Sequence, residues 1–178
     1  MATTRAESAT TSLDRDRSAT VTHGDFTVSR RLTAPRAVAF SAFSDDDIRR
    51  RWIRLPGRGA SYEHDFRVGG GEDARSTFVM PDGASERIRN RSRYLDIVPD
   101  QRIVFSYEAI VDDVVRWVSL VTVMFTDGIP AGSDVVWREQ VAFLVQSGDG
   151  ADLPHLRTGT ALRLNGLAVA LGVEGAVL

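Results

Sequence analysis

The chain contains no cysteine and no lysine among its 178 residues, and each absence excludes a kind of chemistry. Without cysteine, disulfides, thiol catalysis and thiolate metal sites are all excluded. The three histidines, His23, His64 and His155, lie far apart in the sequence, so other metal ligands are sparse. Without lysine, all 22 basic residues are arginine, and the Gly-Lys ending of a phosphate-binding loop is missing. We therefore predict neither a metal nor a cofactor.

Long hydrophobic runs are also missing, because no apolar run approaches the ~18 residues that a membrane span needs. Residues 1–23 are mostly small, polar or charged, without the apolar segment of a secretory signal. We predict that they form a disordered tail, that one domain spans residues 24–174, and that residues 175–178 are its C-terminal end. A cytoplasmic protein without membrane contact is the default expectation.

The overall charge argues against a nucleic-acid partner. The net charge is −2 and the isoelectric point is near 5.9, so the basic footprint of a nucleic-acid-binding domain is missing. The hydrophobic content of 43% is sufficient for a core.

The pattern of apolar residues predicts mainly strands. Alternation over residues 26–32 predicts a first strand, and the folded part is expected to start near Asp25. Pro35 then opens a short helix, and Ser44 is expected to cap a second short helix that ends at Trp52. Further strands are predicted near residues 60–69, 74–80, 85–97, 101–110, 114–126 and 133–145. The short links between these strands imply an antiparallel sheet.

The chain closes with a predicted helix over about residues 152–172, with Asp152 as its cap. Its apolar stripe recurs every three or four residues and consists of Leu153, Leu156, Thr160, Leu164, Leu167 and Leu171. Gly159 and Gly166 share a face, which indicates close backbone packing or, alternatively, access for a ligand. The order of elements predicts an α+β fold, in which a curved antiparallel sheet of about seven strands wraps around the long C-terminal helix.

Residues 69–71 are three consecutive glycines, which are compatible with a phosphate loop or with a tight turn. A phosphate loop needs a following helix, whose free N–H groups hold the anion. Here Glu72 and Asp73 follow, their charges would repel a phosphate, and the next residues resemble another strand. We interpret the glycines as a hairpin turn, beside which Asp65 and Arg67 form a structural ion pair.

Several short segments occur in the order and spacing of a known superfamily. They are residues 32–35 with 38–40, 47–52, 65–70, 93–99 and 102–108, then Glu139 and Gln140 with Phe143, and Gly159. By these segments, which cover most of residues 25–172, the chain resembles the SRPBCC, START-like superfamily with its helix-grip fold. Within that superfamily it resembles bacterial homologues of the activator of heat-shock protein 90 ATPase.

The resemblance implies binding of a hydrophobic small molecule or of a protein partner, without a shared catalytic set. It is also compatible with a homodimer and with a role in the stress response, although no sequence feature requires either. One departure is visible. Members of the family often carry an aromatic residue soon after the paired glycines, where this chain has Gly71, Glu72 and Asp73.

Helix-grip folds commonly enclose a cavity between sheet and helix, and strand alternation predicts which side chains face it. The predicted lining is mostly aromatic with a few polar anchors, which is the makeup of a ligand pocket. It comprises Tyr62, His64, Phe66, Phe78, Met80, Asn90, Tyr94, Phe105, Tyr107, Trp137, Glu139 and Leu164. Trp117 belongs to a strand that is apolar on both faces, so strand alternation does not assign its side chain to either face of the sheet.

The opposite face of the longest predicted strand carries a stripe of arginines. The stripe consists of Arg87, Arg89, Arg91 and Arg93. Four charges side by side would be costly in a core, so we predict a solvated outer face. A surface for a polyanion is the alternative.

Three hypotheses from different classes follow. The favoured one is non-catalytic binding of a hydrophobic or aromatic small molecule in the predicted cavity. The second is an enzyme resembling the polyketide cyclases of the same superfamily, in which His64 and Glu139 would transfer protons. The third is a co-chaperone or partner-binding protein. It predicts an exposed apolar patch or a basic face, for which the arginine stripe is the candidate.

Overall fold

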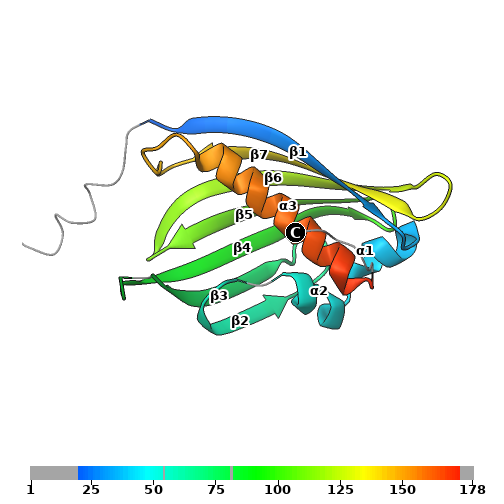
Figure 1. Ribbon diagram of the computed structural model, residues 1–178, viewed down its shortest axis with the longest axis horizontal. Coiled ribbons are helices and arrows are strands. Elements are labelled where there is room, and N and C mark those ends of the chain that lie inside the picture. The colour runs from blue at the N-terminus through cyan, green and yellow to red at the C-terminus, as the bar shows by residue number, and fades with distance from the viewer. Residues whose placement is uncertain (1–19, 54, 81, 173–178) are drawn as a thin grey trace, which may run out of the picture.

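The computed structural model describes residues 20–53, 55–80 and 82–172. Along these residues the elements are β1 (Thr22–Leu32), α1 (Arg36–Ser44), α2 (Asp46–Trp52), β2 (Arg58–His64), β3 (Glu72–Val79), β4 (Ser85–Val98), β5 (Arg102–Val111), β6 (Val114–Asp127), β7 (Ser133–Phe143) and α3 (Asp152–Ala170). The strands form one antiparallel sheet in the order β1-β7-β6-β5-β4-β3-β2. The helix α3 crosses one face of this sheet, and its C-terminal end approaches α1 and α2 (Figure 1).

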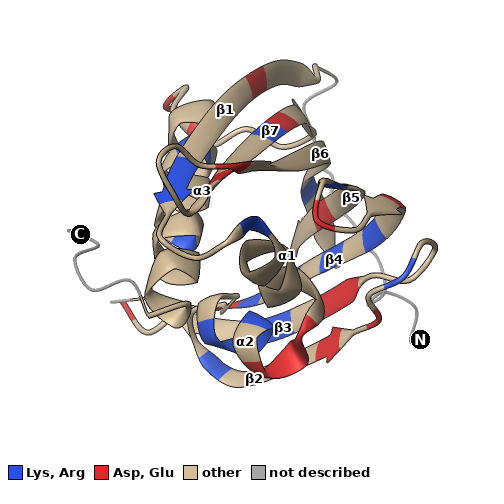
Figure 2. Ribbon diagram, turned by 90° about the vertical axis from the view of Figure 1, so that its right-hand side faces the viewer, with Lys and Arg blue, Asp and Glu red and all other residues tan. Residues whose placement is uncertain are grey.

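The sheet is strongly curved, and the helices occupy its hollow side. Figure 2 shows the strands bending from β1 round to β2, with α1 inside the bend and α3 along one flank. The predicted α+β helix-grip fold is therefore confirmed. None of the described helices is long and apolar enough to cross a membrane.

The core forms where the two-residue period of the strands meets the apolar stripe of α3. On β7 every second residue from Ser133 to Phe143 is buried, and β5 and β6 follow the same alternation. On α3, Thr160, Leu164 and Leu167 are buried against the sheet, as the stripe predicted. Truncating either of these fully buried leucines to alanine would cost about 2–5 kcal/mol.

The ends of several elements differ from the predicted ones. The first strand begins at Thr22 and not near Asp25, because its first residues pair with the end of β7. Residues 1–19 of the predicted tail lie outside the described residues, as do residues 173–178. The predicted strand over 60–69 ends already at His64 and begins at Arg58.

Both predicted helix caps are wrong by one residue. The helix α1 continues through Ser44, whose Oγ donates to the Ser41 carbonyl, so the cap of α2 moves to Asp45. The Asp45 carboxylate accepts from the Ile48 N–H at 2.9 Å. The cap position of α3 is Ala151, and Asp152 is already helical.

The three glycines form the turn between β2 and β3 and hold it against β4. The Gly69 N–H donates to the Tyr94 carbonyl at 2.8 Å, and the Tyr94 N–H donates to the Gly70 carbonyl at 2.9 Å. A side chain at residue 71 would collide with the Ser92 carbonyl, which explains why glycine is needed there. The predicted ion pair beside the turn is confirmed, since Arg67 Nε lies 2.9 Å from Asp65 Oδ2.

The arginine stripe lies on the outer face of β4, as predicted, but acidic neighbours largely neutralise it. Arg87 pairs with Asp112 and Asp113, Arg89 with Asp73, and Arg91 with Glu108. The outer face of β4 is therefore a surface of alternating charge.

Candidate functional site

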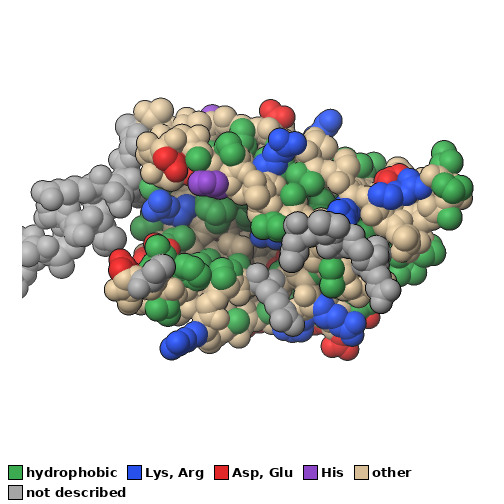
Figure 3. Space-filling model, in the orientation of Figure 1, with side chains coloured by type: hydrophobic (Ala, Val, Ile, Leu, Met, Phe, Trp, Pro, Cys, Tyr) green, Lys and Arg blue, Asp and Glu red, His purple; other side chains and the backbone are tan. Residues whose placement is uncertain are grey.

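Two adjoining pockets lie between α3 and the sheet. The outer pocket has a volume of about 400 Å³ and is lined by Ile88, Asn90, Trp117, Phe143, Asp152, His155, Leu156, Gly159, Thr160 and Arg163. The inner pocket has a volume of about 40 Å³, and its lining includes Arg49, Ile53, Leu55, Glu72, Ala74, Asn90, Phe105, Tyr107, Trp137 and Arg163. Asn90 and Arg163 line both. Figure 3 shows this face hollowed beside α3, with hydrophobic side chains within the hollow.

The two pockets include only part of the predicted lining. Asn90, Phe105, Tyr107 and Trp137 line the inner pocket, and Asn90 also lines the outer one. Trp117, which strand alternation did not assign to a face, points inward and lines the outer pocket. These residues come from the central strands β4 to β7, which α3 crosses (Figure 1).

The remaining predicted residues lie outside the two pockets. Phe66 and Tyr94 pack edge-on within the aromatic core, with their ring centroids 5.0 Å apart. Glu139 and Leu164 are fully buried, and Met80 is 37% exposed beside the β3–β4 turn. Three further predicted residues line neither pocket: Tyr62, His64 and Phe78.

Glu139 lies at the centre of a buried network of neutral hydrogen-bond donors. Its Oε1 accepts from the Tyr107 hydroxyl at 2.6 Å and from the Ser119 hydroxyl at 2.7 Å. Its Oε2 accepts from Trp137 Nε1 at 2.9 Å. Trp117 Nε1 in turn donates to the Tyr107 hydroxyl at 3.1 Å. The carboxylate is thus fully engaged, and it fixes the orientation of aromatic side chains that line both pockets.

Arg49 and Glu72 form a second network at the inner end of the cavity. Arg49 Nε donates to Glu72 Oε1 at 2.6 Å, and the Arg49 side chain is only 2% exposed. The guanidinium carbon lies 4.2 Å from the ring centroid of Trp52, in cation–π contact. Glu72 Oε1 also accepts from the hydroxyls of Tyr62 at 2.7 Å and Tyr94 at 3.1 Å.

The neighbouring Arg49 charge has a large effect on the pKa of Glu72. Burial alone would raise the pKa of the Glu72 carboxyl, but the Arg49 charge and the hydrogen bonds from Arg49 and Tyr62 lower it to about 2. The carboxyl is therefore ionised at neutral pH, and the pair contributes no net charge to the inner pocket.

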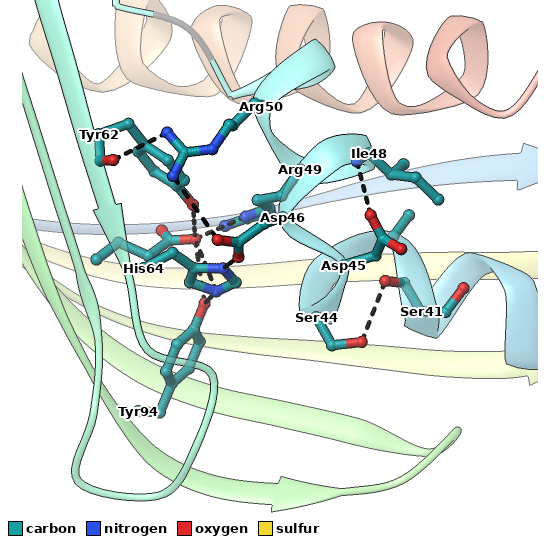
Figure 4. A network of polar contacts seen from close by, with 12 residues as sticks. Ser41, Ser44, Asp45, Asp46, Ile48, Arg49, Arg50, Tyr62, His64 and Tyr94 are labelled. Atoms are coloured by element: carbon teal, nitrogen blue, oxygen red, sulfur yellow. Dashed lines mark hydrogen bonds and ion pairs between the residues drawn. The ribbon is translucent and has the colours of Figure 1, made fainter.

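His64 belongs to the network of Glu72 and not to that of Glu139. Its Nδ1 lies 2.6 Å from Asp46 Oδ1, and its Nε2 lies 3.1 Å from the Tyr94 hydroxyl (Figure 4). The His64 side chain is fully buried and lines neither pocket beside α3. The arrangement ties α2 to β2 and β4, and it does not bring His64 and Glu139 together in one reaction site.

Arg49, Glu72 and Arg163 line the cavity and were not among the predicted residues. Sequence signals existed for the first two. Arg49 precedes Trp52 by three residues, so the helix face that buries Trp52 also buries Arg49. Glu72 shares the strand parity of Ser76, which is buried. Arg163 lies directly before the buried Leu164, and only the packing of α3 shows that it borders the cavity.

The described part of the chain contains no recognisable metal-binding site. No three His, Asp or Glu side chains lie together there as a metal ion would require. The cavity can instead hold an apolar molecule and contact it through a few polar groups.

The curved sheet and the long helix across it, with pockets between them, define a protein of the SRPBCC, helix-grip class. Comparison with family models then identifies the family within this class. Residues 33–171 match the model of the activator of Hsp90 ATPase homolog 1-like proteins, so the chain belongs to that family. No curated protein matches the chain.

Solved structures of bacterial proteins agree with this assignment. The protein Mll3558 from Rhizobium loti is 37% identical, with a TM-score of 0.71 over 85% of this chain and 99% of the other. An uncharacterised protein from Rhizobium leguminosarum is 33% identical, with a TM-score of 0.72 over 85% of this chain and 96% of the other. SA2116 from Staphylococcus aureus, a protein of unknown function, shares the fold at 13% identity, with a TM-score of 0.63 over 85% and 94% of the two chains.

Proposed function

We propose that the protein binds a hydrophobic or aromatic small molecule in the cavity between the sheet and α3, without catalysing a reaction. The observation that carries this proposal is the outer pocket, whose volume of about 400 Å³ falls within the range of ligand sites. Its walls are mainly apolar and include Trp117, Phe143 and Leu156. A cytoplasmic location, as expected from the sequence, is part of the proposal.

The two alternatives receive less support. The cyclase-like enzyme needs polar groups that converge in one pocket, whereas His64 and Glu139 belong to separate hydrogen-bond networks in the described residues. The candidate basic face of the co-chaperone hypothesis was the arginine stripe, and acidic side chains pair with three of its four arginines.

Displacement of a fluorescent hydrophobic dye from the purified protein tests the proposal. Gly159 lines the outer pocket, and a Cβ added there would meet no atom within 4 Å. A leucine at this position would therefore extend into free space and reduce the room for a ligand. We expect Gly159→Leu to weaken dye binding at least tenfold.

The matched control is Thr158→Leu, which adds a leucine to the adjacent exposed residue of α3. It should leave dye binding unchanged. Native mass spectrometry of the freshly purified protein would show whether a copurified molecule already occupies the cavity. The proposal is wrong if the wild-type protein binds no dye after unfolding and refolding free of such molecules.

A further inference from the structure

Arg49 lines the inner pocket and is a buried cation with an unused hydrogen-bond donor. Arg49 is 1% exposed, and its Nε is bound to Glu72. Its Nη1 is buried and has no hydrogen-bond partner among the described residues. A buried N–H without an acceptor is unfavourable, so an acceptor atom brought into this pocket by a ligand would be stabilised.

The charged side chains that line the inner pocket include one cation without an acidic partner among the described residues. Glu72 neutralises Arg49, and Arg91 at the edge of the inner pocket pairs with Glu108. Arg163 borders both pockets and forms no ion pair with another described residue. Asp152, whose carboxylate accepts from the Ser147 N–H, lines only the outer pocket. The inner pocket therefore favours a negatively charged head group over a neutral or cationic one.

The sizes of the pockets indicate where each part of such a ligand would lie. One water molecule needs on the order of 10–15 Å³ of cavity volume. The inner pocket of about 40 Å³ therefore holds a head group of only a few atoms. The outer pocket is ten times larger and can hold the apolar body. Because the two pockets share Asn90 and Arg163, one molecule can extend through both.

We infer that the ligand class is an apolar monocarboxylic acid. Its carboxylate lies in the inner pocket against Arg49 Nη1, with Arg163 and the Asn90 amide at the junction of the two pockets, and its hydrocarbon body lies in the outer pocket. Glu139 lines neither pocket, and its carboxylate oxygens accept three hydrogen bonds from buried side chains. This inference rests on the proposed function and adds the chemistry of the ligand to it.

Calorimetric titration with three probes of the same chain length tests the inference: decanoate, decanamide and decylammonium. We expect decanoate to bind at least tenfold more tightly than decanamide, and decylammonium to bind most weakly. Equal affinities for decanoate and decanamide would overturn the inference and leave the proposed function standing. Binding of none of the three, together with no dye binding, would overturn both.

Substitutions of the cavity's cations test which of them recognises the carboxylate of the ligand. Arg163→Gln should remove the preference for decanoate over decanamide, and Arg163→Lys should restore part of it. Arg157→Gln on the exposed side of the same helix is the control and should retain the preference. The double variant Arg49→Gln with Glu72→Gln removes both buried charges together, and once its fold is verified by near-ultraviolet circular dichroism it should also lose the preference. A preference for decanoate that survives in Arg163→Gln and in the double variant contradicts the assignment.

Discussion

At the scale of single residues, the pair Arg49–Glu72 shows how a charge can be buried without a penalty that unfolds the protein. Arg49 and Glu72 neutralise each other's charge. Two tyrosine hydroxyls also donate hydrogen bonds to Glu72, and the Trp52 ring lies against the Arg49 guanidinium. Breaking such a pair by removing one partner is strongly destabilising, because it leaves an uncompensated buried charge. The pair thereby connects α2 to β3 at the inner end of the cavity.

Replacing Glu72 by glutamine tests this role through its dependence on pH. We expect Glu72→Gln to lower the free energy of unfolding by about 3 kcal/mol at neutral pH, because Arg49 loses its counter-charge. The folded pKa of Glu72 is about 2, below its ordinary value of 4.5, so the stabilisation is complete above pH 4.5 and is lost as the pH falls towards 2. Urea unfolding at several pH values measures both effects.

The control for this experiment is Glu63→Gln on the exposed side of β2. It should change the free energy of unfolding by less than about 0.5 kcal/mol. A difference between the wild type and Glu72→Gln that stays constant from neutral pH down to acid would show that the ion pair is not its source.

At the scale of elements, α3 uses its two interior glycines in different ways. A Cβ at Gly166 would lie 3.5 Å from Trp52 Cβ, in ordinary van der Waals contact, so this position faces α2 and leaves little room for a larger side chain. A Cβ at Gly159 would meet nothing within 4 Å, because this residue lines the outer pocket. The two glycines therefore have different surroundings: Gly166 faces α2, and Gly159 faces the outer pocket.

The same substitution at both glycines separates these roles. We expect Gly166→Leu to lower the free energy of unfolding by about 1–3 kcal/mol, since the side chain would overpack against Trp52. Gly159→Leu should not destabilise the protein, and it should gain up to about 1 kcal/mol from the better helix propensity of leucine. Chemical denaturation of the two variants measures the contrast, and equal destabilisation of both would contradict the different surroundings of the two glycines.

At the scale of the whole molecule, all three tyrosines of the chain donate hydrogen bonds to carboxylates from buried or half-buried positions. Burial raises the pKa of Tyr62, Tyr94 and Tyr107 well above the usual value. The Glu139 charge raises the pKa of Tyr107 further, whereas the Arg49 charge partly opposes the rise at the other two. The folded protein thus has three phenols that resist ionisation.

An alkaline titration followed by tyrosinate absorbance tests this expectation. We expect the folded protein to show little tyrosinate at pH 10, whereas the protein unfolded in guanidinium should titrate with a midpoint near pH 10. Raised folded pKa values contribute stability that is present below pH 10 and is lost as the pH rises further, so ionisation should accompany unfolding. Titration of one third or more of the signal near pH 10 in the folded protein would contradict the burial of these phenols.

Local patterns sufficed to predict the order of strands and helices, the face of β4 that carries the arginines, and the apolar stripe of α3. These features depend on the spacing of residues near each other in the chain, which is two in strands and close to four in helices. The helix caps were harder, since a cap depends on where the preceding element stops. Ser44 belongs to the end of α1, so Asp45 caps α2.

The composition of the cavity depended on contacts between distant segments. Strand parity placed Tyr62, His64 and Tyr94 on the inner face, but it carried no information on how α2 packs. Arg50 and Asp46 of α2 contact Tyr62 and His64, and none of the three predicted residues lines a pocket beside α3. For the same reason the burial of Arg49 and the position of Arg163 emerged only when helices and sheet were in place.

The sequence by itself determined the fold class, the glycine turn and the absence of cysteine chemistry, because each follows from residue types and short-range spacing. Only the tertiary structure decided which polar groups meet in the cavity, since hydrogen bonds and charge pairs reach a few ångströms in space and join residues far apart in the chain.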